Sequence, residues 1–247
     1  MARSRRTYAI GAAVTAMVLV AAAVGAWWFL IRSTAPEEAS IEAAAETLEA
    51  ESAQAATRQI DGTWAVDGTV GSFDDFTGTW AGYRFDEQLA SIGAATAVGR
   101  TPGVTGTMVI DRGKVSDVDV NVDLTTLESD KDRRDQALHH RGLESDSYPT
   151  ATFALTEPIA LTRTSESVAT TAQGELTVHG VTKAVDVDVQ ARMSGGRIAV
   201  VGHAPLQLSE FGIQAPTGYS VLSIEDQGSF EFQIFFVPGP GGTAPSA

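Results

Sequence analysis

Residues 117–124, with the sequence DVDVNVDL, decide the fold class of this 247-residue chain. Apolar side chains occupy every second position, and aspartate or asparagine lies between them. Successive side chains of a β-strand point to opposite faces, whereas a helix repeats every ~3.6 residues. The segment is therefore expected to be a strand with one wet face and one dry face. The dry face consists of Val118, Val120, Val122 and Leu124.

The same two-residue period returns further along the chain. It is carried by Val185, Val187 and Val189 in one segment and by Phe230, Phe232, Ile234 and Phe236 in another. Additional strands are expected at Thr63–Val66, Thr79–Phe85, Thr105–Ile110, Thr150–Leu155, Val168–Val178 and Arg197–His203. Turn-forming pairs such as His179-Gly180 separate these segments. Only residues 130–142, DKDRRDQALHHRG, predict a helix, which is short and strongly charged.

This many antiparallel strands cannot stay in one open layer. A twisted sheet of roughly eight strands hides its apolar face and its edges by closing into a barrel or by folding into a two-layer sandwich. Regularly alternating hairpin strands favour an all-β, antiparallel, eight-stranded barrel with one short helix. Such a barrel is either filled by its own side chains or holds one small ligand, and the periodicity leaves both alternatives open.

The chain begins with a membrane-spanning pattern. Tyr8–Ile31 is apolar and uncharged throughout, long enough for a helix to cross a hydrocarbon core of about 30 Å. Three arginines precede it and glutamates follow it, which places the N-terminus in the cytoplasm. Residues 1–32 are thus expected to be a cytoplasmic stub and signal-anchor, in a single-pass protein of the cell membrane with an extracytoplasmic barrel. The alternative is a cleaved signal peptide with Val24-Gly25-Ala26 as its cleavage site.

The remaining boundaries follow from composition. Residues 33–58 are rich in alanine and glutamate, with Ile41 and Leu48 as the large apolar side chains, and predict a stalk or linker. A helical stalk and a disordered linker are both compatible with this composition. Residues 59–237 form the barrel domain, and residues 238–247, PGPGGTAPSA, predict a flexible tail.

Composition also excludes several functions. The chain has 17 Lys+Arg against 31 Asp+Glu, a net charge of −14, so no nucleic-acid partner is expected. The absence of cysteine excludes disulfides, thiolate metal sites and thiol nucleophiles. The four histidines lack metal-site spacing, and no nucleophile or phosphate-binding motif is present. A non-catalytic protein without metal or cofactor is expected.

Several short motifs resemble the successive signatures of the YceI-like family. They are Arg134-Asp135, YPTATF at 148–153, GELTVHGVTK at 174–183 and SEFG at 209–212, and the resemblance covers about residues 61–236. It implies a lipocalin-like barrel, exported in bacteria, that holds a polyisoprenoid chain in an interior channel. Residues 81–106 depart from the family pattern by lacking an expected histidine. The extra length between Glu87 and Val98 has two interpretations: it forms part of the barrel mouth, or it is an ordinary loop.

The candidate ligand-binding residues combine the apolar faces with three cations. The apolar candidates are Val118, Val120, Val122, Leu124, Phe153, Val185, Val187, Val189, Phe230, Phe232 and Ile234. Arg84, Arg100 and Arg134 are the candidates for an anionic head group, and for Arg134 the alternative is to fix the short helix over one barrel end.

These patterns together predict an extracytoplasmic protein that holds an isoprenoid or similar apolar chain in its barrel, as carrier, store or transporter. Its expected partners are this lipid and the membrane, and self-association is left open. The alternative is an envelope interaction or stress-associated protein whose barrel is packed solid.

Overall fold

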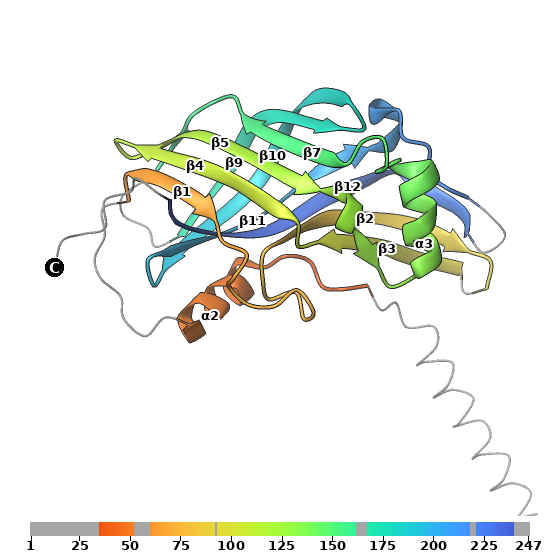
Figure 1. Ribbon diagram of the computed structural model, residues 1–247, viewed down its shortest axis with the longest axis horizontal. Coiled ribbons are helices and arrows are strands. Elements are labelled where there is room, and N and C mark those ends of the chain that lie inside the picture. Colours follow the sequence, from red (N-terminus) through yellow and green to blue (C-terminus); the bar gives the residue numbers. More distant parts are fainter. Residues whose placement is uncertain (1–34, 52–59, 92, 162–166, 218–220, 240–247) are drawn as a thin grey trace, which may run out of the picture. The chain divides into compact units, whose positions relative to one another are not determined.

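The computed structural model describes residues 35–51, 60–91, 93–161, 167–217 and 221–239. Figure 1 shows the arrangement of their strands and helices. The helices are α2 (Ile41–Glu51) and α3 (Asp132–Ala137), and short helical turns cover Leu124–Thr126, Leu138–Gly142 and Leu208–Phe211. The strands are β1 (Gly62–Val66), β2 (Trp80–Leu89), β3 (Gly93–Thr101), β4 (Val104–Asp111), β5 (Lys114–Asp123), β6 (Glu128–Ser129), β7 (Thr150–Leu155), β8 (Ile159–Ala160), β9 (Ser167–Val178), β10 (Val181–Ser194), β11 (Arg197–Gln207) and β12 (Val221–Pro238).

Eight of these strands close into an antiparallel ring. Their order is β1-β4-β5-β7-β9-β10-β11-β12, and β12 returns to β1 through the pairs Trp64–Pro238 and Val66–Phe236. Closure leaves no free edge within the ring. The eight-stranded antiparallel barrel predicted from the alternating segments is confirmed, as are the lipocalin-like form that the family resemblance implies and the short helix after residue 130.

β12 is long enough to serve two neighbours on one side. Its last residues pair with β1, whereas Val221–Gln233 pairs with β2 across two irregularities. β3 pairs with β2 along Gly93–Thr101, and the short β6 adds to β3. Glu87–Leu89 pairs with Gly93–Ala95 in antiparallel register, so the described residues of this stretch belong mainly to the two strands of a hairpin and not to a long loop.

The N-terminal described segment differs from the expected stalk. Helix α2 packs against the outer face of β10 and β11, and Ala44 and Leu48 have no exposed surface (Figure 1). Ser40 begins the helix by accepting a hydrogen bond from the backbone N–H of Ala43. One face of α2, with Ile41, Ala44 and Leu48, is thus part of the domain's core, and the predicted domain start at residue 59 is too late for this helix.

The predicted membrane segment Tyr8–Ile31 lies outside the described residues. Among the helices that the structure describes, none has the length and apolar character needed to cross a bilayer. At the other end, Pro238 still belongs to β12, and the backbone N–H of Gly239 donates to the carbonyl of Thr63 at 2.8 Å. The predicted tail from residue 240 onward is also outside the described residues.

Candidate functional site

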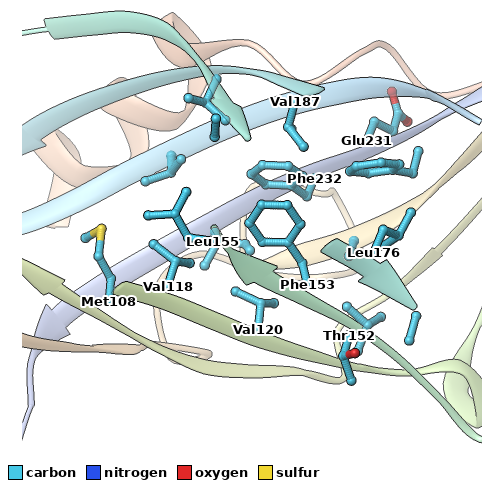
Figure 2. Close-up of a pocket in the computed structure, with 18 of the residues that line it drawn as sticks. Met108, Val118, Val120, Thr152, Phe153, Leu155, Leu176, Val187, Glu231 and Phe232 are labelled. Atoms are coloured by element: carbon cyan, nitrogen blue, oxygen red, sulfur yellow. The ribbon is translucent and has the colours of Figure 1, made fainter. Parts of the chain in front are cut away.

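An apolar cavity of about 220 Å³ lies inside the ring of strands. Figure 2 shows Phe153 of β7 and Phe232 of β12 in its middle, with Met108 of β4 to one side and Leu176 of β9 to the other. A single buried water needs roughly 10–15 Å³ by the same kind of measure, and close-packed interiors hold few voids larger than a water. The barrel interior is therefore not close-packed.

All but one of the apolar candidates border this cavity. Those in its wall are Val118, Val120, Val122, Leu124, Phe153, Val187, Val189, Phe230, Phe232 and Ile234. Val185 is not in the wall but packs against the adjoining hydrophobic clusters that contain Leu176 and Val187. Ligand binding by these side chains remains a prediction.

The alternation of β5 explains how the sequence builds the wall. Val120 pairs with Phe153 of β7 and is buried, whereas Asp119 and Asn121 are exposed on the outside. The same parity on β10 points Val187 inward and leaves Asp186 exposed. One face of each strand therefore lines the cavity, and the other meets water.

Sequence reasoning missed part of the wall. The structure adds Met108 of β4, Tyr83 of β2, Val200 of β11, and Thr170 and Ala172 of β9. The signal on β9 was present, since Val168, Thr170, Ala172, Leu176 and Val178 keep the two-residue period. Threonine and alanine weaken the hydrophobic contrast on which that pattern depends.

Two glycines allow aromatic rings to lie along the wall. A Cβ at Gly174 would stand 2.4 Å from the ring of Phe153, and a Cβ at Gly202 would stand 2.6 Å from the ring of Phe232. Real Cβ atoms do not approach this closely, so the rings occupy the space above the glycine backbone. Their bulk is thus laid against the strands and takes less of the lumen.

Arg134 of α3 forms ion pairs near one end of the cavity. It reaches Glu87 of β2 and Asp130, each at 2.5 Å. Burial lowers the pKa of Arg134, but the charge of Glu87 and the bond to Asp130 outweigh burial, so the pKa is raised and the side chain stays charged. Arg134 is not in the cavity wall. Its contacts correspond to the alternative in which it fixes the short helix to the barrel.

Tyr83 is the polar side chain of β2 in the cavity wall. Its hydroxyl is buried and has no hydrogen-bond partner among the described residues. Burial raises the pKa of Tyr83; the positive charge of Arg134 opposes this, and the carboxylates of Asp135 and Glu87 add to it. The hydroxyl is therefore protonated at neutral pH.

Arg84 and Arg100 lie on the outer face of the β2–β3 hairpin. Arg100 Nη2 is 2.8 Å from Glu231 Oε1, Arg84 Nη2 is 3.3 Å from the same atom, and Arg100 and Glu231 are each 3% exposed. The guanidinium of Arg100 also stacks over Trp80 at 3.7 Å. Figure 2 shows the Glu231 carboxylate pointing away from the cavity. Neither arginine borders the cavity, so this placement does not support the expected head-group contact from inside the barrel.

These arginines instead hold the segment before α2. Arg84 Nη2 donates to the carbonyl of Pro36 at 2.8 Å, and Arg100 Nη2 donates to the carbonyl of Glu37 at 2.5 Å. Burial lowers the pKa of Arg100, and its bond to Glu231 opposes that effect. The cluster therefore fixes residues 36–37 on the barrel through charged hydrogen bonds.

The described residues contain no group of three or more histidine, cysteine, aspartate or glutamate side chains arranged to hold a metal ion. His179 contacts the carbonyl oxygen of Phe211 through Nδ1 at 3.2 Å, and its Nε2 lies 3.5 Å from Glu144. The ring also packs on Tyr148. These contacts join the turn after β9 to neighbouring loops.

Comparison with known proteins adds a family to this geometry. A profile of the YceI-like domain matches residues 47–236. A UPF0312 protein of Vibrio parahaemolyticus is 27% identical over 160 residues, which cover 61% of this chain and 82% of that protein. A UPF0312 protein of Vibrio campbellii is 26% identical over 160 residues, with the same shares of both chains.

A solved structure shares the fold. It is described as a polyisoprenoid binding domain from Saccharophagus degradans implicated in plant cell wall breakdown. The TM-score is 0.54 at 17% identity, and the match covers 71% of this chain and 98% of that one. Because the domain profile spans well over half of the sequence, in agreement with the motifs found between Arg134 and Gly212, this protein belongs to the YceI-like domain family.

Proposed function

We propose that this protein is an extracytoplasmic, membrane-anchored binder of isoprenoid or similar apolar chains, which it carries, stores or transports without transforming them. The cavity carries the proposal, because its volume of about 220 Å³ and its hydrocarbon wall are what an apolar chain requires. A barrel that served only as a packed interaction module would have closed this space, since empty volume costs contacts between side chains.

The energetics favour a long apolar ligand. Each methylene transferred from water into such a wall contributes about 0.8 kcal/mol before the cost of ordering the chain. The rings of Phe153 and Phe232 and the branched side chains of β5 offer contact without polar groups that would need partners. The description of the S. degradans domain as polyisoprenoid binding supports the same class of ligand.

The extracytoplasmic location is supported by the sequence before residue 33. Protease added outside intact spheroplasts is expected to digest the barrel domain or release it from the membrane fraction. Digestion only after lysis would contradict the proposed orientation.

Lipid extraction tests the binding function. The full-length chain is purified from its membrane, its lipids are extracted, and the extract is analysed by mass spectrometry against an extract of an unrelated single-pass protein. A near-stoichiometric polyprenyl species, absent from the control, is expected. A repeatedly empty extract, combined with no uptake of added polyprenol, would refute the proposal.

A further inference from the structure

Every strand of the ring pairs with a neighbour on each side, but the pairing of β9 on its β7 side is incomplete. β7 pairs with β9 as far as Leu155 and Gly174, and the backbone N–H of Thr156 donates a last hydrogen bond to the carbonyl of Gln173 at 2.9 Å. Beyond that bond, no ladder pair among the described residues joins β8 to Ser167–Ala172 of β9. We call this stretch the β8–β9 seam.

The backbone on both sides of the β8–β9 seam bonds away from it. β8 pairs with the start of β5, and the backbone N–H of Leu161 donates to the carbonyl of Gly113 at 2.9 Å. On the other side, Ser167–Ala172 pairs with Val187–Arg192 of β10. Within the part of the chain that the structure describes, the seam is therefore closed by side chains and not by backbone hydrogen bonds.

The cavity reaches the β8–β9 seam from inside. Ile159 and Leu161 line the cavity on one side of the seam, and Val168, Thr170 and Ala172 line it on the other. Apart from the threonine hydroxyl, these side chains are hydrocarbon. An apolar chain that passed between the two strands would thus stay in contact with apolar surface until it reached the cavity.

Both ends of the cavity are packed more firmly than its side. At the Met108 end, the buried side chains of Trp64 and Ile198 belong to the same core cluster as Met108 and do not border the cavity. At the Leu176 end, the buried Phe211 packs in the cluster of Leu176 and is likewise outside the cavity wall (Figure 2). A ligand entering at either end would have to displace close-packed core residues.

A second break in the strand pairing is bridged by polar bonds. It lies where β4 continues past its last pair with β1. There the hydroxyls of Thr101 and Thr126 are 2.6 Å apart, and the backbone N–H of Asp123 donates to the carbonyl of Gly103 at 2.7 Å. Opening the wall at this place would break these bonds, whereas the β8–β9 seam has no backbone bond between described residues to break.

We propose that an apolar chain enters and leaves the cavity sideways, through the β8–β9 seam, and not through an end of the barrel. Parting two paired strands leaves their N–H and C=O groups without partners beside an apolar wall, which is unfavourable. Parting β8 from β9 moves side chains alone and replaces their contacts with contacts to the ligand. This inference rests on the proposed function and specifies how its ligand reaches the cavity.

A reversible cross-link across the β8–β9 seam tests the route. The chain has no cysteine, so two introduced cysteines react without competition. The seam variant combines Ala160→Cys with Ala169→Cys, two exposed positions on opposite sides of the seam. The matched control combines Glu175→Cys with Ala184→Cys, an exposed ladder pair of β9 and β10 that backbone bonding already holds together. Each pair is joined by a short bismaleimide that contains a reducible disulfide.

The probe is deuterated geranylgeraniol, loaded into the full-length chain in amphipol before the link is formed. Its transfer to excess phosphatidylcholine vesicles is followed by mass spectrometry of the separated protein. Linking the seam pair is expected to slow release about tenfold, and reduction of the linker is expected to restore the original rate. Linking the control pair is expected to leave the rate unchanged. Thermal denaturation of both variants checks that the barrel is intact.

The outcomes distinguish the route from the binding function. If linking the seam pair leaves the release rate unchanged, or if linking either pair slows release equally, the route is wrong while apolar-chain binding stands. If the original chain takes up no geranylgeraniol, the proposed function fails and the route fails with it.

Discussion

Val200 and Val201 are neighbours on β11 and share their chemistry, but they face two different apolar regions. Val200 borders the cavity, whereas Val201 lies on the outer face beneath α2, in a cluster with Leu48, Ala199 and Phe235. In that outer cluster Ala199, Leu48 and Phe235 have no exposed surface. The inner face of β11 borders the cavity, whereas its outer face is covered by helix α2.

The comparison teaches that apolar character alone does not identify a binding surface. One face of β11 packs against a helix, and the opposite face of the same strand borders a cavity. Close packing on the outside requires a partner element whose side chains fit the strand, which α2 provides through residues spaced along one helical face. Inside the ring the described residues provide no such covering helix, and the cavity is lined mainly by strand residues with a few side chains from turns, such as Leu127 and Leu143. What distinguishes the two faces is therefore the presence of a covering element.

A charge on the cavity wall should have the largest effect. Val120→Asp places a carboxylate against Phe153 in a cavity wall whose described residues include no lysine or arginine, and such a buried ion costs several kcal/mol. The domain is expected to unfold or to lose all bound lipid, as measured by urea denaturation and lipid content. Asp119→Lys, one residue away on the wet face, should shift the free energy of unfolding by less than about 0.5 kcal/mol. The reverse ranking would show that β5 faces the other way.

Truncating a side chain in the outer cluster beneath α2 should have the second-largest effect on stability. Leu48→Ala removes a side chain with no exposed surface between α2 and β11, and we expect a loss of about 2–5 kcal/mol in unfolding free energy. Glu46→Ala, exposed on the same helix, is the matched control and should be nearly neutral. If Leu48→Ala also proves neutral in guanidinium denaturation, α2 does not share the cooperative unfolding of the barrel.

A large side chain in the cavity wall separates a channel from a packed core. Val187→Trp enters space available to a ligand, so stability should stay within about 1 kcal/mol of the original while co-purifying lipid falls. Asp186→Trp places the same side chain outside and should change neither quantity. A loss of about 1–3 kcal/mol with lipid content unchanged would mean that the wall around Val187 is packed tight.

The smallest effect is expected from truncating Val200 and Val201, which compares the two faces of β11 directly. Val201→Ala opens a void in a packed cluster, whereas Val200→Ala widens an existing cavity. The Val201 variant is expected to be the less stable of the two by about 1 kcal/mol, measured by thermal denaturation of delipidated protein. Equal losses would indicate that the interior is packed as densely as the contact under α2.

The strands in which apolar and polar residues alternate clearly were predictable from the sequence. β5 and the end of β12 alternate apolar with charged or polar residues, and β7 was predicted with its observed bounds, Thr150–Leu155. β3 was not predicted, because its sequence GAATAVGRT consists mainly of small residues and both faces of its second half are buried. A strand covered on both sides has no wet face to mark its period.

Two features of the site were within reach of the same reasoning. Tyr83, Arg84 and Phe85 are consecutive in a predicted strand, so an inward Tyr83 places Arg84 outside. For α2, Ile41, Ala44, Ala45 and Leu48 follow the spacing of one helical face, but alanine was not counted as a core residue. The ion pairs Arg100–Glu231 and Arg134–Glu87 could not be predicted, because the two partners of each pair are distant in sequence and unmarked by any motif.

The docking of α2 has a practical consequence for solubility. A chain shortened to begin at Gln59, where composition alone suggests the domain starts, would keep every strand of the ring. It would also expose Val201 and Phe235 to water on neighbouring strands and leave Arg100 and Arg84 without their backbone acceptors. Such a contiguous exposed apolar patch promotes self-aggregation, although the net negative charge of the molecules makes them repel one another. A truncated protein that retains the residues from Ala35 onward is therefore expected to stay in solution without aggregating.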